Sequence, residues 1–298
     1  MEYNSLIEFI SKNKEHKDIP CLEIKEFLQN TSKSNIYAVD GGNAVIIDGG
    51  TWIISKVRTA VVLYNKNRVN ESHTSYIVAN TENAVKSEPE EEIALPKKIE
   101  ISEIPNHFRK IMEVEECIKS VEKAEKDDIV LCDFLFIPDN VVIALKINEL
   151  IKKAEKKGVV VVGIGKTSRA NIKGNSLIGF LNSMNQNKKS LWYSILEPAS
   201  NYTDLVAKLY PLSKYTYRIN TNSKDIENTL GILSYYSSDT AIPGYPYPLI
   251  RADWLARITD NEKHLEKTEI GKNKDYRKLS MDERSMDFHE RLDEHAHK

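Results

Sequence analysis

Aspartate residues follow two apolar runs that are predicted to be buried strands. Asp40 follows Ile36–Val39 and precedes two glycines, and Asp133 follows Ile129–Cys132. A carboxylate at a strand end is held by a rigid sheet, and glycine allows close approach of a backbone or a ligand. Magnesium and manganese prefer carboxylate oxygens as ligands. Both residues are therefore candidate metal ligands, although Asp40 followed by glycine is equally typical of a plain hairpin turn.

A third source of carboxylates is the helix predicted over residues 107–126. Its apolar residues recur on one face at helical spacing, at Ile111, Val114, Ile118 and Val121. Glu113, Glu115 and Glu116 lie within it, just before the strand that leads to Asp133. One of the three can complete a carboxylate set. The other two are expected to be solvated.

Lys166 follows the apolar run Val159–Ile164 in the sequence GIGKTS. The pattern invites a phosphate-binding loop, but that motif requires glycine where this chain has Val160. A lysine at a strand end near two carboxylates can instead bind a phosphate or stabilise developing charge.

The segment from Gly244 to Arg257 opens with alternating tyrosine and proline, GYPYP. Such a stiff turn can project the rings of Tyr245 and Tyr247 for stacking on unpaired bases. The alternative is a helix-entry turn with core tyrosines, and the segment alone favours that alternative.

The composition sets limits on class and partners. The 298 residues have a formal net charge of −2, so any nucleic-acid contact would use a local groove. The odd count of three cysteines without a CxxC pair disfavours both a disulfide framework and a zinc-thiolate site. The N-terminus does not resemble a signal peptide, and the apolar runs are too short to span a membrane. We expect a cytoplasmic protein.

The order of predicted elements indicates an α/β fold. Three β-rich runs separated by Gly-Gly pairs (36–39, 44–47 and 52–64) predict an antiparallel meander. A helix, a strand over 129–136, a helix over 139–156 and the strand in GVVVVGIGK follow. This order fits a ribonuclease H-like mixed sheet flanked by helices.

Further elements are predicted on both sides of this core. Residues 1–30 are expected to form an N-terminal helical segment, 31–259 the main domain, and 260–298 a charged tail, either a solvated helix or disordered. The polar stretch of about 65–103 is expected to be a long excursion or a mobile loop. The remaining expectations are helices over 4–12, 22–29, 171–185, 226–236 and 244–258, and strands in SLWYSIL and YTYRIN.

Together, in this order, the motifs resemble the NurA family of nucleases, which work with the HerA-type hexameric translocase in DNA-end resection. The matching pieces are YAVDGG, FRKIMEVEE, IVLCDFL, GIGKTSR and GYPYPLIRADWLARI, which span residues 37–258. The resemblance implies a ribonuclease H-like fold and a homodimer. It also implies manganese-dependent (or magnesium-dependent) cleavage of single- and double-stranded DNA, and docking onto the translocase.

By position, the resemblance implies catalytic roles for Asp40, Glu113, Asp133, Lys166 and Tyr245. Metal would be held by Asp40, Asp133, Glu113 and Asp253, and DNA by Lys166, Arg169, Tyr247 and Arg251. Helical phase places Glu115 nearer the apolar face than Glu113, which leaves the helix ligand open.

Two departures from the family pattern stand out. Phe134 and Leu135 follow Asp133, where the family usually has Gly-Ser, and Asp253 occupies a position that is commonly histidine. One alternative is therefore a catalytically weak subunit that clamps DNA or regulates the translocase. A nucleotide-binding protein built on GIGKTS is the other.

Overall fold

The computed structural model describes residues 23–31, 34–64, 69–80, 84–87, 90–93, 99–165, 171–172, 175–176, 189–198, 201–273 and 276. The chain divides into two compact units. We call Lys33–Gly163 with Tyr247–Lys298 the core unit, and Met1–Ser32 with Ile164–Pro246 the second unit.

The core unit is built on a mixed sheet. Its strands are β2 (Ile36–Asp48), β3 (Trp52–Tyr64), β4 (Val69–Asn80), β5 (Ala84–Ser87), β6 (Glu90–Ile93), β7 (Ile129–Cys132) and β8 (Val160–Gly165). They lie in the order β8-β7-β2-β3-β4-β5-β6. β2, β3 and β4 are antiparallel neighbours, whereas β7 is parallel to both β2 and β8. A meander extended by parallel strands is the ribonuclease H-like arrangement expected from the sequence, and the prediction of a mixed sheet flanked by helices is confirmed.

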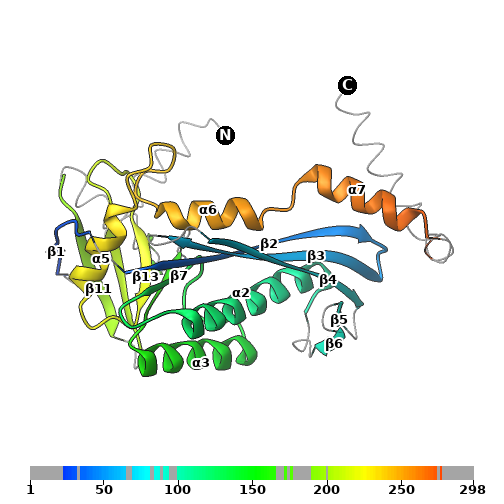
Figure 1. Cartoon of the computed structure of the whole chain (residues 1–298), viewed down its shortest axis with the longest axis horizontal. Coiled ribbons are helices and arrows are strands. Elements are labelled where there is room, and N and C mark those ends of the chain that lie inside the picture. Colours follow the sequence, from blue (N-terminus) through cyan, green and yellow to red (C-terminus); the bar gives the residue numbers. More distant parts are fainter. Residues whose placement is uncertain are drawn as a thin grey trace, which may run out of the picture. The chain divides into compact units, whose positions relative to one another are not determined.

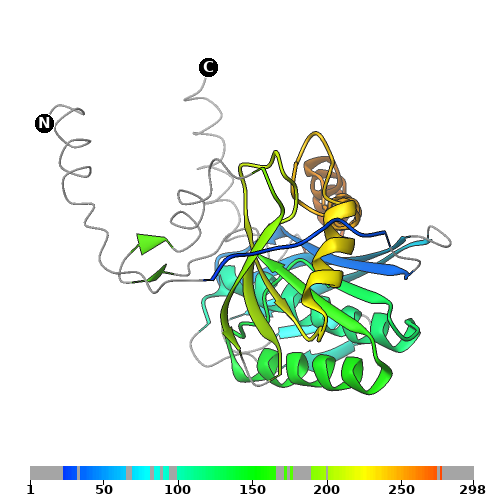
Figure 2. The same ribbon diagram turned by 90° about the vertical axis from the view of Figure 1, so that its left-hand side faces the viewer.

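Helices cover both faces of this sheet. α2 (Ile104–Lys123), preceded by the short η1 (Ile101–Glu103), and α3 (Val141–Lys157) lie on one side. α6 (Tyr247–Ala256) and α7 (Asp260–Gly271) lie on the other, as Figures 1 and 2 show. Both α2 and α6 contact β2 and β3. A side chain on β2 therefore meets a different helix according to the face on which it lies.

Local sequence explains where these helices begin and end. α2 buries apolar residues, among them Phe108 and Met112, against a cluster that includes Ile53, Val57 and Ile77 of the sheet. α3 starts at Asn140, whose side chain accepts a hydrogen bond from the Ile143 N–H. It ends at Gly158, which has a φ of 69° that favours glycine. α7 opens with a capping box between Thr259 and Glu262.

One strand was predicted wrongly in a way that matters for the site. The runs 36–39 and 44–47 are a single strand, β2, because Gly41 and Gly42 continue the ladder with β3 instead of turning. Asp40 therefore lies within a strand, one residue beyond the last pair with β7. The hairpin turn lies at the second glycine pair, as predicted, where Gly50 has a φ of 79°.

The predicted polar excursion and two predicted helices also need correction. Within 65–103 the chain forms β4, β5 and β6, because alternate residues of β4 such as Ser75, Ile77 and Ala79 are buried while their neighbours face solvent. Residues 23–29 are not helical, and Lys25–Glu26 form β1 instead. The proposed helix over 171–185 begins with β9 (Asn171–Ile172) and β10 (Asn175–Ser176). Its remaining residues, like 4–12, lie outside the described residues.

The second unit contains its own antiparallel strands, in the order β1-β11-β12-β13. The predicted strands are confirmed as β11 (Trp192–Pro198) and β13 (Tyr217–Thr221), and the predicted helix as α5 (Ile226–Tyr235). The sequence analysis did not identify β12 (Thr203–Lys208), which pairs with both.

Two observations bear on the predictions about membrane spans and cysteines. Within the described part of the chain, no helix combines the length and the apolar character that a membrane span requires. Cys117 and Cys132 are free, fully buried thiols whose Sγ atoms are 3.1 Å apart. Cys21 lies outside the described residues.

Replacing Gly42 by alanine should destabilise the core unit. A Cβ atom at this position would overlap the backbone carbonyl oxygen of Ala256, at the end of α6. Because backbone cannot rotate away as a side chain can, we expect a loss of about 1 to 3 kcal/mol in the free energy of unfolding, measured by urea denaturation.

The matched control is Gly271→Ala at the end of α7, where a new Cβ would meet nothing within 4 Å. It should change stability by less than about 1 kcal/mol. Equal effects of the two substitutions would contradict the packing of α6 against β2.

Candidate metal centre

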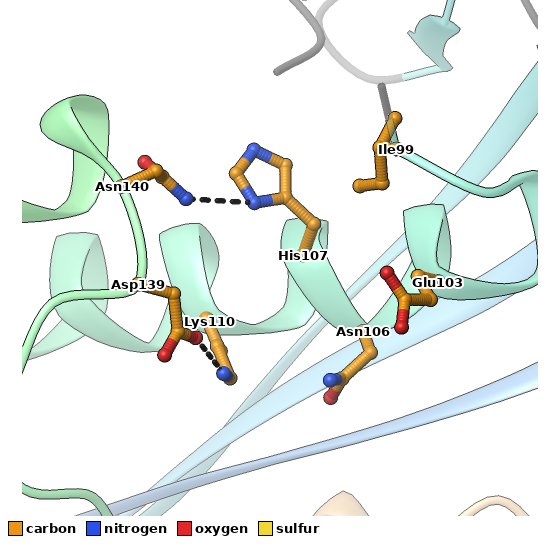
Figure 3. A pocket seen from close by; sticks show the side chains of 7 residues that line it. All are labelled: Ile99, Glu103, Asn106, His107, Lys110, Asp139 and Asn140. Atoms are coloured by element: carbon orange, nitrogen blue, oxygen red, sulfur yellow. Dashed lines mark hydrogen bonds and ion pairs between the residues drawn. The ribbon is translucent and has the colours of Figure 1, made fainter. Parts of the chain in front are cut away.

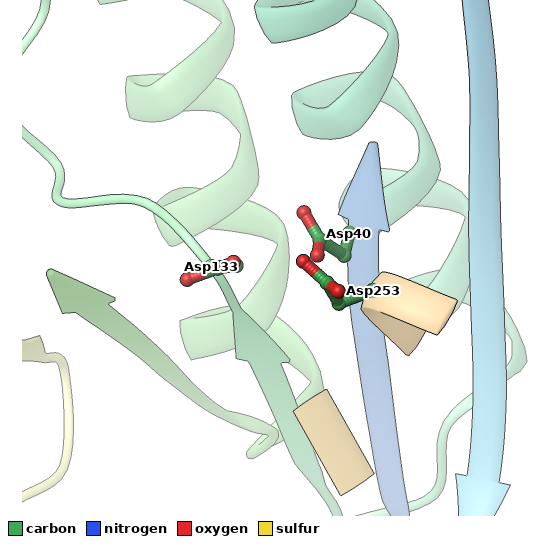
Figure 4. Close-up of side chains that lie close together, drawn as sticks. All are labelled: Asp40, Asp133 and Asp253. Carbon is green, nitrogen blue, oxygen red and sulfur yellow. The ribbon is translucent and has the colours of Figure 1, made fainter. Parts of the chain in front are cut away.

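Three aspartates of the core unit converge. Asp40, Asp133 and Asp253 each offer one carboxylate oxygen, and these three atoms lie within 4.8 Å of one another. Figure 4 shows the side chains side by side, from β2, from the chain just after β7, and from α6. Three carboxylates at this spacing can hold a divalent ion such as Mn²⁺ or Mg²⁺, which prefers oxygen ligands.

Strand pairing fixes the positions of two of the three aspartates, Asp40 and Asp133. Asp40 is 4% exposed, and one of its carboxylate oxygens accepts a hydrogen bond from the Gly41 N–H at 2.7 Å. The backbone N–H of Asp133 donates to the carbonyl of Val39 at 3.3 Å, which extends the contact between β7 and β2 by one residue. The two aspartates are thus neighbours across adjacent strands.

Asp253 reaches the same point from α6. Successive residues of a strand face opposite sides of the sheet. A Cβ at Gly41 would meet Glu113 of α2, and one at Gly42 would meet α6. Asp40 therefore shares the α6-facing side with Gly42. That side is where Asp253 lies.

Glu113 packs on the opposite side of β2. Its side chain is 1% exposed and forms an ion pair with Arg109, one turn earlier on α2. The group of three aspartates, sought among the described residues only, does not include Glu113, and its role as a metal ligand stays a prediction. Glu115 is half-exposed and pairs with Lys146 at 2.6 Å. Helical phase had placed Glu115 nearer the apolar face, but Glu115 is the more exposed of the two glutamates.

Burial dominates the electrostatics of Glu113. Desolvation raises its pKa to about 7, and the charge of Asp133 adds to this rise, whereas Arg109 opposes it. Among the described residues, its buried Oε2 atom has no hydrogen-bond partner. The carboxyl group is therefore poised to exchange a proton near neutral pH.

Asp253 has a cationic neighbour of its own. Arg257, four residues later and just beyond the end of α6, lies 3.1 Å from its carboxylate. The arginine is 63% exposed at its side chain and the aspartate 34%. The metal centre is thus open to solvent on its α6 side and buried at Asp40.

The other predicted site residues carry no carboxylate, and the structure describes only some of them. Lys166 and Arg169 lie outside the described residues. Tyr245 belongs to the second unit, where its ring is 2% exposed and packs 5.3 Å from that of Tyr217. Tyr247 is half-buried, with its ring 6.0 Å from Tyr64. The guanidinium of Arg251 lies over the ring of Trp254.

A polar pocket of about 330 Å³ lies elsewhere in the core unit, where η1 and α2 meet the start of α3. It is lined by Ile99, Glu103, Asn106, His107, Lys110, Asp139 and Asn140, shown in Figure 3. Asp139 and Lys110 form an ion pair, and Asn140 bonds to His107. No predicted site residue lines it.

Sequence reasoning missed three residues next to the carboxylates. Arg109 and Arg257 stand four residues from Glu113 and Asp253, a spacing that signals ion pairs on a helix. Trp254 adjoins Asp253 and is 59% exposed. Its position in the α6 sequence, between Asp253 and Leu255, gave no indication of that exposure.

These features can be set beside known proteins. A family model described as the NurA domain matches residues 34–258. The chain belongs to the NurA family. No curated protein matches it. The family membership predicted from the motifs is confirmed.

Solved NurA structures share the fold. The NurA nuclease from Sulfolobus solfataricus has a TM-score of 0.62 at 15% identity, covering 91% of this chain and 95% of its own. A second NurA structure gives 0.56 at 11% identity, with 87% and 92% covered. A NurA structure bound to dAMP and manganese gives 0.56 at 10% identity, with 88% and 92% covered. At these identities the likeness concerns the fold alone.

The departures of this NurA chain can now be placed. Asp253 stands where histidine is common, and it contributes an oxygen to the three-carboxylate cluster. Phe134, which replaces the usual glycine after Asp133, packs against Phe136 with ring centroids 6.3 Å apart. The first departure thus places a carboxylate in the cluster, and the second places an aromatic ring directly after Asp133 in the chain.

The raised pKa of Glu113 predicts a pH-dependent stability. The folded state holds the Glu113 proton up to about pH 7, whereas the unfolded chain releases it near pH 4.5. The free energy of unfolding should therefore fall as pH rises between these values. Glu113→Gln removes this loss, so its stability relative to wild type should improve by on the order of 3 kcal/mol across that window. Urea denaturation in EDTA measures it.

The control is Glu115→Gln on the same helix, where the side chain remains in contact with solvent. If the free energy of unfolding of Glu115→Gln, relative to wild type, rose similarly with pH, Glu113 would not be the cause of the effect.

Proposed function

We propose that this chain is a divalent-metal-dependent deoxyribonuclease that hydrolyses phosphodiester bonds in single- and double-stranded DNA. The observation that carries the proposal is the convergence of Asp40, Asp133 and Asp253. Carboxylate clusters of this kind serve metal-assisted phosphodiester hydrolysis. The NurA structure bound to dAMP and manganese supports manganese as the ion and a nucleotide as the occupant.

The donor set fits such an ion. One carboxylate is buried and held by its strand, and two are half-exposed, so a substrate phosphate can approach from the open side. When bound, a divalent ion supplies an activated water and neutralises charge on the scissile phosphate.

The chain's own residues would then divide the remaining work. Asp40 is held rigid by β2 and by the N–H of Gly41. Glu113, whose burial raises its pKa to about 7, is proposed as a further metal ligand supplied by α2. Lys166 is proposed to stabilise the negative charge that develops on the scissile phosphate, and Tyr245 to position the DNA strand. Arg169, Tyr247 and Arg251 are proposed DNA contacts.

The partners proposed from the family are a HerA-type hexameric translocase and a second copy of this chain, acting in DNA-end resection and repair in the cytoplasm. The net charge of −2 supports a partner that supplies part of the DNA affinity.

The two rival functions receive less support. A catalytically weak subunit was suggested by the loss of a histidine, but Asp253 replaces it with another metal-binding group within the cluster. A phosphate-binding loop needs its glycines in the turn after the strand, where backbone N–H groups surround the phosphates, whereas Gly163 and Gly165 lie in β8. Metal-dependent cleavage is the function that the geometry favours.

Replacing Asp40 by asparagine should abolish cleavage. Asparagine keeps the shape and the acceptor for the Gly41 N–H but removes the charge that binds metal. Removing a residue that only supports a metal ligand typically lowers metal affinity or activity about 10- to 100-fold. Removing a direct ligand should therefore lower the rate of cleavage in manganese by at least about a hundredfold. The measurement is cleavage of labelled single- and double-stranded DNA.

Asp48→Asn is the control, because this exposed aspartate sits in the β2–β3 turn and bonds only locally to the Gly50 N–H. Full cleavage by the Asp40→Asn variant in manganese would defeat the assignment.

Asp253→His should change the metal preference. Carboxylates suit Mg²⁺ and Mn²⁺, whereas imidazole favours ions such as Co²⁺ and Ni²⁺. We expect the ratio of cobalt-supported to magnesium-supported cleavage to rise roughly tenfold in this variant. Asp260→His, at a fully solvated position on α7, serves as the control. An unchanged ratio in Asp253→His would remove Asp253 from the metal ligands.

A further inference from the structure

Trp254 is an exposed aromatic residue next in sequence to one of the three clustered aspartates. It directly follows Asp253 on α6, and 59% of it is accessible to solvent. By contrast, Trp192 is fully buried and Trp52 is half-buried. Burying a large aromatic side chain is worth several kcal/mol, so a tryptophan left in solvent forgoes stability. Single exposed apolar residues are common, so the case for a binding role rests on the groups around this ring.

The ring is held by a neighbour on the same helix. The guanidinium carbon of Arg251 lies 5.3 Å from the centroid of the Trp254 ring. This cation–π contact joins residues three apart, which lie on the same side of a helix. The contact restricts the ring before any ligand arrives. A ring that is already ordered loses less conformational entropy on binding.

Arginines precede and follow the ring in the sequence. Arg251 and Trp254 lie three residues apart on α6, and Arg257 follows three residues later, just beyond the end of the helix. Arg257 is 63% exposed at its side chain and pairs with the carboxylate of Asp253. In a chain with a net charge of −2, this short segment is locally cationic and aromatic, and it includes one of the three clustered carboxylates.

The combination of groups identifies the ligand. Arginine binds phosphate, and an exposed ring stacks on the flat face of a base. The bases of an intact duplex already stack on one another, so a side-chain ring can take up only a base that is unpaired. An acidic peptide would satisfy the arginines but would leave the ring without a flat partner.

We propose that Trp254 stacks on the base of an unpaired nucleotide next to the phosphate held at Asp40, Asp133 and Asp253, with Arg251 orienting the ring. This deepens the proposed nuclease function and rests on it. It assigns to the α6 surface a preference for single-stranded or frayed DNA over intact duplex.

The test is binding on the full chain with Ca²⁺, which also takes carboxylate oxygens as ligands, and a denaturing gel checks that the DNA stays intact. Trp254→Leu removes the aromatic ring and Trp254→Phe retains one. Binding to an oligothymidine is expected to weaken about ten- to a hundredfold in Trp254→Leu and by less than about threefold in Trp254→Phe. Binding to a blunt duplex of equal length should change less than about twofold, because phosphate contacts dominate there. Fluorescence anisotropy of labelled DNA reports both.

Tryptophan fluorescence gives a second readout. Oligothymidine should quench the emission of the wild type and of the Trp52→Phe control, and the quenching should disappear in Trp254→Phe. Unchanged oligothymidine affinity in Trp254→Leu, or an equal loss for duplex, would overturn the stacking role. A changed oligomeric state of Trp254→Leu in gel filtration would also overturn it, by assigning the ring to a contact between chains.

Failure of this inference is distinct from failure of the nuclease proposal. If the wild type cleaves DNA in manganese but Trp254→Leu binds oligothymidine normally, the stacking role is wrong and the nuclease stands. If the wild type cleaves no DNA with manganese or magnesium, the nuclease proposal is wrong. The binding data still decide whether the ring contacts a base.

Discussion

The mutual repulsion of three carboxylates held within 4.8 Å is the constraint on which the rest of the core unit depends. Two unit charges at this separation repel by about 3 to 4 kcal/mol at an effective dielectric constant of about 20. Such a cluster survives only on a scaffold that cannot relax. β2 supplies it, because its backbone is paired with β3 along nearly its whole length and with β7 up to the residue before Asp40.

Gly41 and Gly42 allow two helices to pack closely against β2, one on each face. The absence of a side chain at Gly41 admits Glu113 of α2 on one face, and its absence at Gly42 admits the end of α6 on the other. The two faces then differ in electrostatics. On the α2 side a buried carboxyl with a raised pKa is partly compensated by Arg109. On the α6 side Asp253 keeps access to solvent and is paired with the exposed Arg257.

The same glycines explain what the sequence did and did not predict. Asp40 and Asp133 were identified because each follows an apolar strand, and parallel pairing of β2 with β7 then makes them neighbours. The continuity of β2 was missed because Gly-Gly reads locally as a turn, while the ladder with β3 is a tertiary effect. The membership of Asp253 in the cluster was predicted from the family pattern alone, because no local rule relates a residue on α6 to one more than 200 positions earlier.

The asymmetry of the two faces also bears on how a substrate would reach the proposed site. A polyanion approaching from the α2 side would meet a closed surface, since Glu113 is 1% exposed and α2 covers β2 there. From the α6 side it would meet half-exposed carboxylates beside a row of two arginines and an exposed ring. Acidic groups that bind metal repel phosphate until an ion is present, so cations must stand close by to admit it. Arg257 is paired with Asp253, and a divalent ion competing for that carboxylate would release the arginine toward the incoming phosphate. Metal binding and DNA binding would therefore reinforce each other at this face.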